Sequence, residues 1–266
     1  MANHLRAQIM ALLAGILLAT PAFSELPSRE YKQPAADITA LLTEPPPAEP
    51  LLHYGSGKIA LLHREATLSM ARLSQPYLGL AGFRFNPVTR RSGIGPLLGK
   101  VEVVSTDSAT LGAVQVWEPS DKQARLDDVQ FSPDGRYLSA QLVSTGTTRL
   151  AVYDTQTGKA RVFDTPINPA WGSPCQWLSN REMLCRLVTN TSPFATPALN
   201  QPVVIEHNGG PAPVRTYSNL LKNTAGDLAF EHYFTTTLAR VDVQGAATLL
   251  PDISGLLEQM TPSPDG

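Results

Sequence analysis

Apolar and polar residues alternate along several short segments of the chain, a pattern typical of half-buried β-strands. The clearest segment follows Gly135. One of its faces carries Leu138, Ala140 and Leu142, and the other carries Tyr137, Ser139, Gln141 and Val143. Residues 129–131 before it, and 149–153 and 160–163 after it, show the same strand character. Because short polar turns separate these segments, we expect a meander of antiparallel strands.

One tetrapeptide, Ser-Pro-Asp-Gly, occurs twice, at 132–135 and 263–266. Proline fixes φ at the second position, aspartate can bond the backbone at the third and glycine suits the last, so each copy predicts a tight type I turn. The strand pattern also returns downstream, at 238–242 and 246–250, and a weaker start lies at 54–62.

Repeated meanders with a recurring turn are the sequence pattern of β-propeller blades. We therefore expect an all-β fold built from such blades. The alternative is a β-sandwich whose turns resemble one another by accident. Other segments fall outside the meander: a short helix at 37–42, a stiff proline linker at 45–50, a helical or loop insertion at 64–80, and further insertions at 211–213 and 215–223.

The first 24 residues have the pattern of a cleaved secretory signal. A short region with His4 and Arg6 precedes an apolar run of about a dozen residues, and small residues lead to a cleavage point after Ser24. The alternative is a membrane-anchoring helix, but the run is shorter than the roughly 20 residues that a bilayer requires. We expect a periplasmic or secreted protein without a membrane span after cleavage.

Composition narrows the classes of partner. Apolar residues make up 42% of the 266 residues, enough for a globular core, and 23 prolines with 19 glycines favour turns over long helices. The formal charge is −2, with no basic stripe, so nucleic acid is not an expected partner. We expect no cofactor and no metal site.

The two cysteines, Cys175 and Cys185, flank a segment that reads as strand, turn and strand. If Asn180 is the middle of a three-residue turn, the two cysteines face each other across the hairpin, close enough for a disulfide. An oxidising compartment favours that bond, and two buried free thiols are the alternative.

Several segments together resemble the N-terminal propeller of exported prolyl oligopeptidase family serine peptidases, with the glutamyl endopeptidase-like branch the most similar. They are residues 34–42 with the prolines that follow, 80–87, 132–135, 154–161, Gln176 with Trp177, and 215–223. The resemblance departs at 54–58 and at Ser179 and Asn180, where the family turn is altered. It implies a propeller that restricts which peptides reach a C-terminal α/β-hydrolase domain bearing a Ser-Asp-His triad.

No catalytic residue can be assigned from the sequence. The G-x-S-x-G elbow of an α/β-hydrolase does not occur in the chain, and Gly55, Ser56 and Gly57 are too short to form one. Leu52 stands where a phosphate-binding loop would need its first glycine. His53, His63, His207 and His232 have no partners at an interpretable spacing, and we expect surface or packing roles for them.

Three functional hypotheses follow. The first is the propeller portion of an exported serine peptidase: a signal at 1–24, an N-terminal segment and linker at 25–50, and a partial propeller at 51–266 without the hydrolase domain. On this hypothesis the chain is catalytically incomplete, and its second tetrapeptide lacks a return strand, so we expect a marginally stable domain.

The second hypothesis is a stand-alone envelope propeller that binds partners. The third, a hydrolase site among Asp127, Asp128, Asp134 and the histidines, is the weakest, because surface turns would explain those acids.

Overall fold

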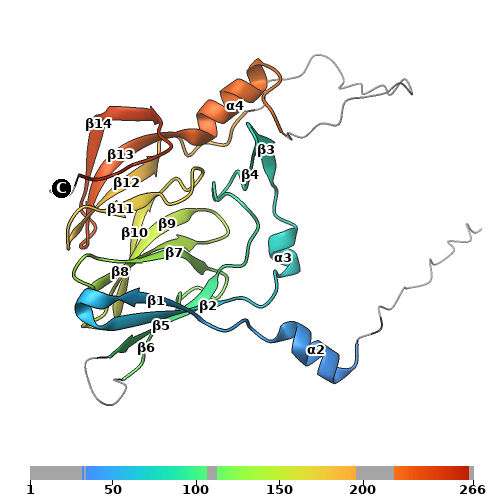
Figure 1. Ribbon diagram of the computed structural model, residues 1–266. Coiled ribbons are helices and arrows are strands. Elements are labelled where there is room, and N and C mark those ends of the chain that lie inside the picture. Colours follow the sequence, from blue (N-terminus) through green and yellow to red (C-terminus); the bar gives the residue numbers. More distant parts are fainter. Residues whose placement is uncertain (1–31, 33, 107–112, 196–218, 264–266) are drawn as a thin grey trace, which may run out of the picture. The chain divides into compact units, whose positions relative to one another are not determined.

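The computed structural model describes residues 32, 34–106, 113–195 and 219–263 (Figure 1). Its contacts divide the chain into two units, Met1–Leu42 and Thr43–Gly266. Helix α2, Ala36–Thr43, confirms the short helix expected at 37–42. The expected signal at 1–24 lies outside the described residues. No helix in the described part is long and apolar enough to cross a membrane.

Twelve of the fourteen described strands form three groups of four antiparallel strands, which we call blades 1 to 3. Blade 1 contains β1 (Glu49–His53), β2 (Lys58–Arg64), β5 (Leu98–Ser105) and β6 (Gln115–Trp117). Blade 2 contains β7 (Arg125–Phe131), β8 (Tyr137–Val143), β9 (Thr148–Asp154) and β10 (Lys159–Pro166). Blade 3 contains β11 (Cys175–Trp177), β12 (Glu182–Val188), β13 (Thr235–Asp242) and β14 (Ala247–Leu256). A single Cα pair, Leu98 with Leu126, joins blades 1 and 2 into one eight-stranded sheet. The prediction of an all-β fold of antiparallel meanders is confirmed.

Side chains along the strands of blade 2 alternate between its two faces, and each face contributes to a hydrophobic core. One face contributes Leu138, Ala140, Ala151 and Tyr153 to a core shared with blade 1. The other contributes Tyr137, Leu150, Val152 and Phe163 to a core shared with blade 3. The blades therefore follow one another in chain order, as Figure 1 shows, and the central blade is the most deeply buried.

The first Ser-Pro-Asp-Gly copy forms the predicted tight turn between β7 and β8. The Gly135 backbone N–H donates to the Ser132 carbonyl at 2.8 Å, and Gly135 has φ 67°. It packs on the turn of blade 1, the 3-10 helix η1 (Tyr54–Ser56), so closely that a Cβ on Gly135 would lie 2.2 Å from Ser56 Oγ. The second copy lies outside the described residues except for Ser263.

The cysteine hairpin has the predicted register. Cys175 pairs with Cys185, Gln176 with Leu184 and Trp177 with Met183. The cysteines form a disulfide with their Cα atoms 4.2 Å apart, and both lie in the core between blades 2 and 3.

Several elements differ from the sequence-based expectation. Strand β1 begins at Glu49, so the last two residues of the expected linker at 45–50 belong to the sheet. There Pro50 sits on an edge strand, which tolerates the missing backbone N–H. The segment 64–80 holds both helix α3 (Met70–Leu73) and strand β3 (Leu78–Leu80), and β3 pairs with β4 (Phe83–Phe85). The insertion at 211–213 and most of 215–223 lie outside the described residues.

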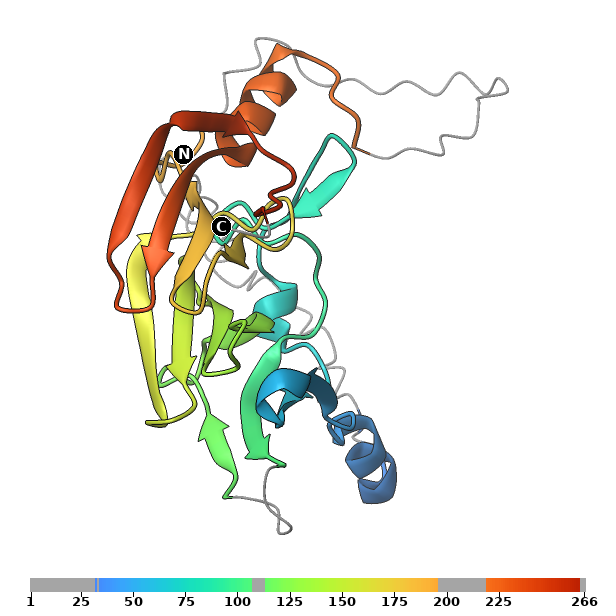
Figure 2. The same cartoon turned by 60° about the vertical axis from the view of Figure 1, so that its left-hand side comes forward.

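Helix α4, Thr224–Phe234, precedes β13 and was not expected from the sequence. Figure 2 shows it at the end of the long β13–β14 hairpin. Its Phe234 is fully buried among Phe85, Trp171 and Phe230, with ring centroids 4.5 to 5.1 Å away. Arg90 donates to the carbonyls of His232 and Tyr233 at the helix end. This aromatic cluster fixes the loop around Trp171.

Candidate functional site

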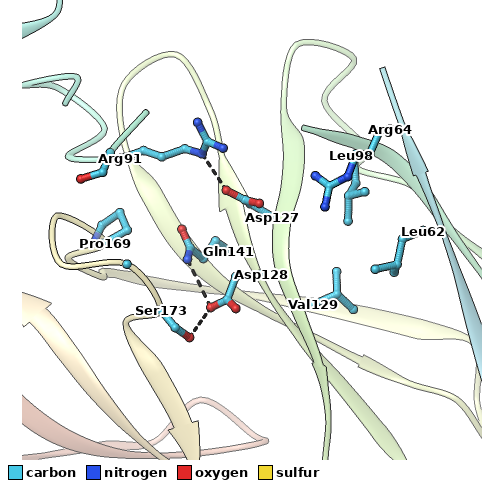
Figure 3. Close-up of a pocket in the computed structure, with 12 residues that line it drawn as sticks. Leu62, Arg64, Arg91, Leu98, Asp127, Asp128, Val129, Gln141, Pro169 and Ser173 are labelled. Atoms are coloured by element: carbon cyan, nitrogen blue, oxygen red, sulfur yellow. Dashed lines mark hydrogen bonds and ion pairs between the residues drawn. The ribbon is translucent and has the colours of Figure 1, made fainter. Parts of the chain in front are cut away.

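A cavity of about 350 Å³ lies beside the start of blade 2 (Figure 3). The wall is formed by strands β2, β5, β7 and β8, the loop before β5, and the loop between β10 and β11. The lining residues are Leu62, Arg64, Arg91, Ser92, Leu98, Asp127, Asp128, Val129, Gln141, Pro169, Gly172 and Ser173. Arg91 lies on the side of Asp127 and Asp128, whereas Arg64 lies beside the aliphatic side chains of Leu62 and Leu98 (Figure 3).

Asp127 and Asp128 reach the cavity through a β-bulge. The register between β7 and β8 shifts between Asp127 and Gln130, so the strict alternation of the strand is broken there. Asp128 has φ 48°, in the left-handed region that residues other than glycine seldom adopt. Both acids lie within a strand rather than in a surface turn, which corrects the explanation that we gave for them from the sequence.

The cations of the cavity are each paired with a carboxylate. Arg91 Nε lies 2.6 Å from Asp127 Oδ2, and Arg91 Nη1 donates to the Gly93 carbonyl at 3.0 Å. Arg64 Nη2 lies 3.0 Å from Glu49 Oε2, and the hydrogen bond to Glu49 raises the pKa of Arg64. These pairings leave little positive charge available for an anionic ligand.

Asp128 is held by neutral donors. Ser173 Oγ donates to its Oδ2 at 2.5 Å, Gln141 Nε2 donates to the same oxygen at 3.3 Å, and Gln130 Nε2 donates to Oδ1 at 3.1 Å. Figure 3 shows Ser173 and Gln141 converging on this carboxylate. Among the described residues, no cation lies within 4.0 Å of it.

The loop that carries Ser173 is fixed from two sides. Buried Asn168 donates to the Tyr233 carbonyl at 3.0 Å and accepts from the Ala170 N–H, and Ser92 Oγ donates to the Ala170 carbonyl at 2.6 Å. Arg186, only 1% exposed, donates to the Ser173 carbonyl at 2.6 Å. The Asp128 partners are therefore positioned before any ligand arrives.

Other residues of the weakest hypothesis do not join Asp127 and Asp128. Asp134 lies in the turn before β8, where it accepts from Ser132 Oγ at 2.6 Å and from the Arg136 N–H at 3.0 Å. Partial burial acts to raise the pKa of Asp134, but these hydrogen bonds hold it below its usual value. The Asp134 carboxylate therefore stabilises the turn by accepting hydrogen bonds within it.

The described histidines serve packing and surface contacts. His63 Nε2 lies 3.0 Å from Glu102 Oε2 on strands β2 and β5. His232 packs against Phe194 and Tyr233, and its pKa is lowered by burial and by the nearby Arg90 charge. His207 lies outside the described residues.

His53 and Ser56 form a contact that the sequence analysis missed. Ser56 Oγ lies 2.9 Å from His53 Nδ1, and the Ser56 N–H donates to the same nitrogen at 3.1 Å, so His53 Nε2 donates to the Pro133 carbonyl. Gly135 takes up the space beside the Ser56 hydroxyl. This pair therefore caps η1 beside the Gly135 backbone.

The cavity has the features of a binding site. Its described lining contains no histidine or cysteine, and Ser173, one of its two serines, already donates to a carboxylate rather than to a base. No group of three or more metal-ligating side chains occurs in the described part of the chain. Fixed charges, neutral donors and an aliphatic wall are suited to holding a small polar ligand.

Comparisons with known proteins give a distant resemblance. No family model matches the chain. A rice protein (Oryza sativa subsp. japonica) described as "Probable glutamyl endopeptidase, chloroplastic" is 27% identical over 252 residues, covering 88% of this chain and 26% of the relative. The chain therefore spans about a quarter of that relative's length.

Two solved structures of acylaminoacyl peptidases also align with the chain. The one from Pyrococcus horikoshii has a TM-score of 0.40 and 12% identity, covering 82% of this chain and 26% of that one. The other, in complex with Z-Gly-Gly-Phe-chloromethyl ketone, has a TM-score of 0.35 and 10% identity, covering 80% and 26%. The chain thus distantly resembles a part of prolyl oligopeptidase family peptidases.

Proposed function

We propose that this chain supplies the first blades of a β-propeller in an exported peptidase of the prolyl oligopeptidase type. The supporting observation is the 27% identity to the rice protein over 252 residues, which cover 88% of this chain. A propeller segment contributes walls and contacts for peptides, and the chemistry belongs to a separate hydrolase domain.

The described site agrees with a role without chemistry. The described lining of the cavity holds fixed polar groups but no nucleophile aligned with a base, and the contact between Ser56 and His53 caps η1. In the proposed peptidase, the blades would limit which peptides reach the hydrolase domain. The second candidate is a stand-alone envelope propeller that binds partners, and the fixed polar groups of the cavity are equally compatible with that role.

The complete product of the natural gene distinguishes the two candidates. We expect it to cleave a short Glu-containing peptide and to spare the same sequence inside a folded protein domain, and we expect a serine-directed reagent to stop the cleavage. Absence of hydrolysis of any peptide would contradict the peptidase proposal and favour the binding module. Equal cleavage of the free peptide and the folded domain would contradict restriction by the propeller.

A further inference from the structure

Asp128 is the cavity carboxylate that has no direct ion pair among the described residues. Asp127 is neutralised by Arg91 at 2.6 Å, whereas the three hydrogen bonds to Asp128 come from uncharged Ser173, Gln141 and Gln130. Arg186 interacts with Asp128 only electrostatically, and its guanidinium is bonded to the carbonyls of Leu257, Glu258 and Ser173. A partly buried carboxylate without an ion pair favours a cationic ligand.

Gln141 provides an independent sign of a missing donor. Its side chain lines the cavity and is only 5% exposed, and its amide nitrogen is engaged by Asp128. Its Oε1 is buried and has no hydrogen-bond partner among the described residues. Buried acceptors of this kind are usually satisfied, so a ligand donor beside Asp128 would complete the network.

The backbone at Asp128 is held in an unfavourable conformation. A left-handed φ of 48° in a residue with a side chain costs free energy, and the bulge that imposes it also turns the carboxylate toward Ser173. Bulges that redirect a side chain recur beside functional sites. The strain at this position is explained if the carboxylate is needed where it stands.

Leu62, Leu98 and Val129 form an aliphatic part of the cavity wall, and Figure 3 shows Arg64 beside Leu98. We propose that the cavity binds a primary ammonium group carried on an aliphatic chain, as in a lysine side chain. The ammonium would donate to Asp128 and to Gln141 Oε1, and the methylene groups would pack on the aliphatic wall. An anion is disfavoured, because Asp128 would repel it while Arg64 and Arg91 are engaged.

This inference goes beyond the proposed function, since binding to this cavity requires no hydrolase domain. It is tested on the full 266-residue chain by calorimetric titration with Nα-acetyl-lysine amide. The matched ligand is Nα-acetyl-norleucine amide, which keeps an aliphatic chain but lacks the ammonium. Alanyl-alanine amide supplies an ammonium without the chain and separates a peptide amino terminus from a lysine side chain.

We expect saturable binding of the lysine derivative, with no binding of the norleucine derivative and weaker binding of alanyl-alanine amide. Asp128→Asn keeps the shape but removes the charge, and should weaken binding at least about tenfold. Gln141→Met removes the free oxygen at similar size and should also weaken it. Asp252→Asn, on exposed strand β14, is the control and should bind like the unmodified chain.

Equal binding of the lysine and norleucine derivatives would overturn the proposal, as would unchanged affinity in both cavity variants. Alanyl-alanine amide binding as tightly as the lysine derivative would refute the role of the aliphatic wall. Circular dichroism and thermal unfolding establish that each variant is folded. If neither cavity variant folds, the comparison of the lysine derivative with the other two ligands on the unmodified chain still tests the proposal.

Discussion

Two residues with left-handed backbones shape the contacts that blade 2 makes. Gly135 brings the turn of blade 2 onto η1 of blade 1, and Asp128 bulges β7 so that its carboxylate enters the cavity. Lys58 Nζ reinforces the first contact by donating to the Gly135 carbonyl at 3.0 Å and to Thr155 Oγ1 at 2.8 Å. Position 135 requires glycine because its φ is positive and because a Cβ there would clash with Ser56. Asp128, in contrast, adopts a positive φ despite having a side chain.

Gly135→Ala should destabilise the protein. The new Cβ would lie 2.2 Å from Ser56 Oγ and 2.5 Å from His53 Nδ1, and alanine resists φ 67°, so we expect a loss of about 1–3 kcal/mol in the free energy of unfolding. Denaturant titration measures it. Gly146→Ala is the control, because its Cβ would meet nothing within 4 Å. An equal effect of the two substitutions would refute the packing argument.

Stability should fall in acid through Asp134 and Asp154. Partial burial acts to raise both pKa values, but hydrogen bonds hold them below the ordinary 3.8: from Ser132 and the Arg136 N–H for Asp134, and from the Gln156 N–H and the Arg136 side chain for Asp154. A carboxylate with a lowered folded pKa stabilises the fold above its unfolded pKa and loses that contribution as pH falls through its folded pKa.

We therefore expect the urea midpoint to drop between pH 5 and pH 2, and to drop less in Asp134→Asn and Asp154→Asn than in the unmodified chain. Asp252→Asn serves as the surface control. The same acid dependence in all four proteins would show that these two carboxylates do not carry the effect.

At the scale of elements, the register of the cysteine hairpin and the two faces of β8 were predictable, because both depend on strict alternation. The bulge at Asp127 and Asp128 was not, since an inserted residue breaks the period without leaving a glycine or proline as a signal. Helix α4 was also missed. Its one local signal is Asn223, whose side chain accepts from the Gly226 N–H, and the helix is stabilised mainly by aromatic packing with residues far away in sequence.

Reduction of the disulfide should lower stability modestly. The bond closes a loop of about ten residues, so the expected loss is at most about 3 kcal/mol. Thermal unfolding with and without dithiothreitol measures the difference. The Cys175→Ala/Cys185→Ala variant is the control and should be insensitive to the reductant. Equal unfolding temperatures for the oxidised and reduced unmodified chain would contradict this expectation.

Phe234→Ala should cost about 3–5 kcal/mol, because the fully buried ring is the centre of the aromatic cluster that holds α4 and the Trp171 loop. Leu228→Ala on the same helix is the matched control, since that side chain is 47% exposed. Denaturant titration compares them, and similar losses would show that the cluster does not anchor the helix.

At the scale of the whole molecule, three blades share two cores, and the polar cavity lies beside the start of the central blade. The blade organisation could be predicted because each meander repeats the same local pattern. The cavity could not be predicted, since its residues come from six segments that only the packing of the blades brings together. Arg64 and Ser173, for example, are more than 100 positions apart.

The central claim is that these blades serve a peptidase without containing its catalytic groups. It is tested most directly by incubating the purified 266-residue chain with Glu-containing and Pro-containing peptides and with a serine-directed covalent reagent. We predict no turnover and no labelling of any serine, because Ser56 and His53 are engaged in the η1 cap and Ser173 donates to Asp128. Peptide turnover that the reagent abolishes would contradict the account.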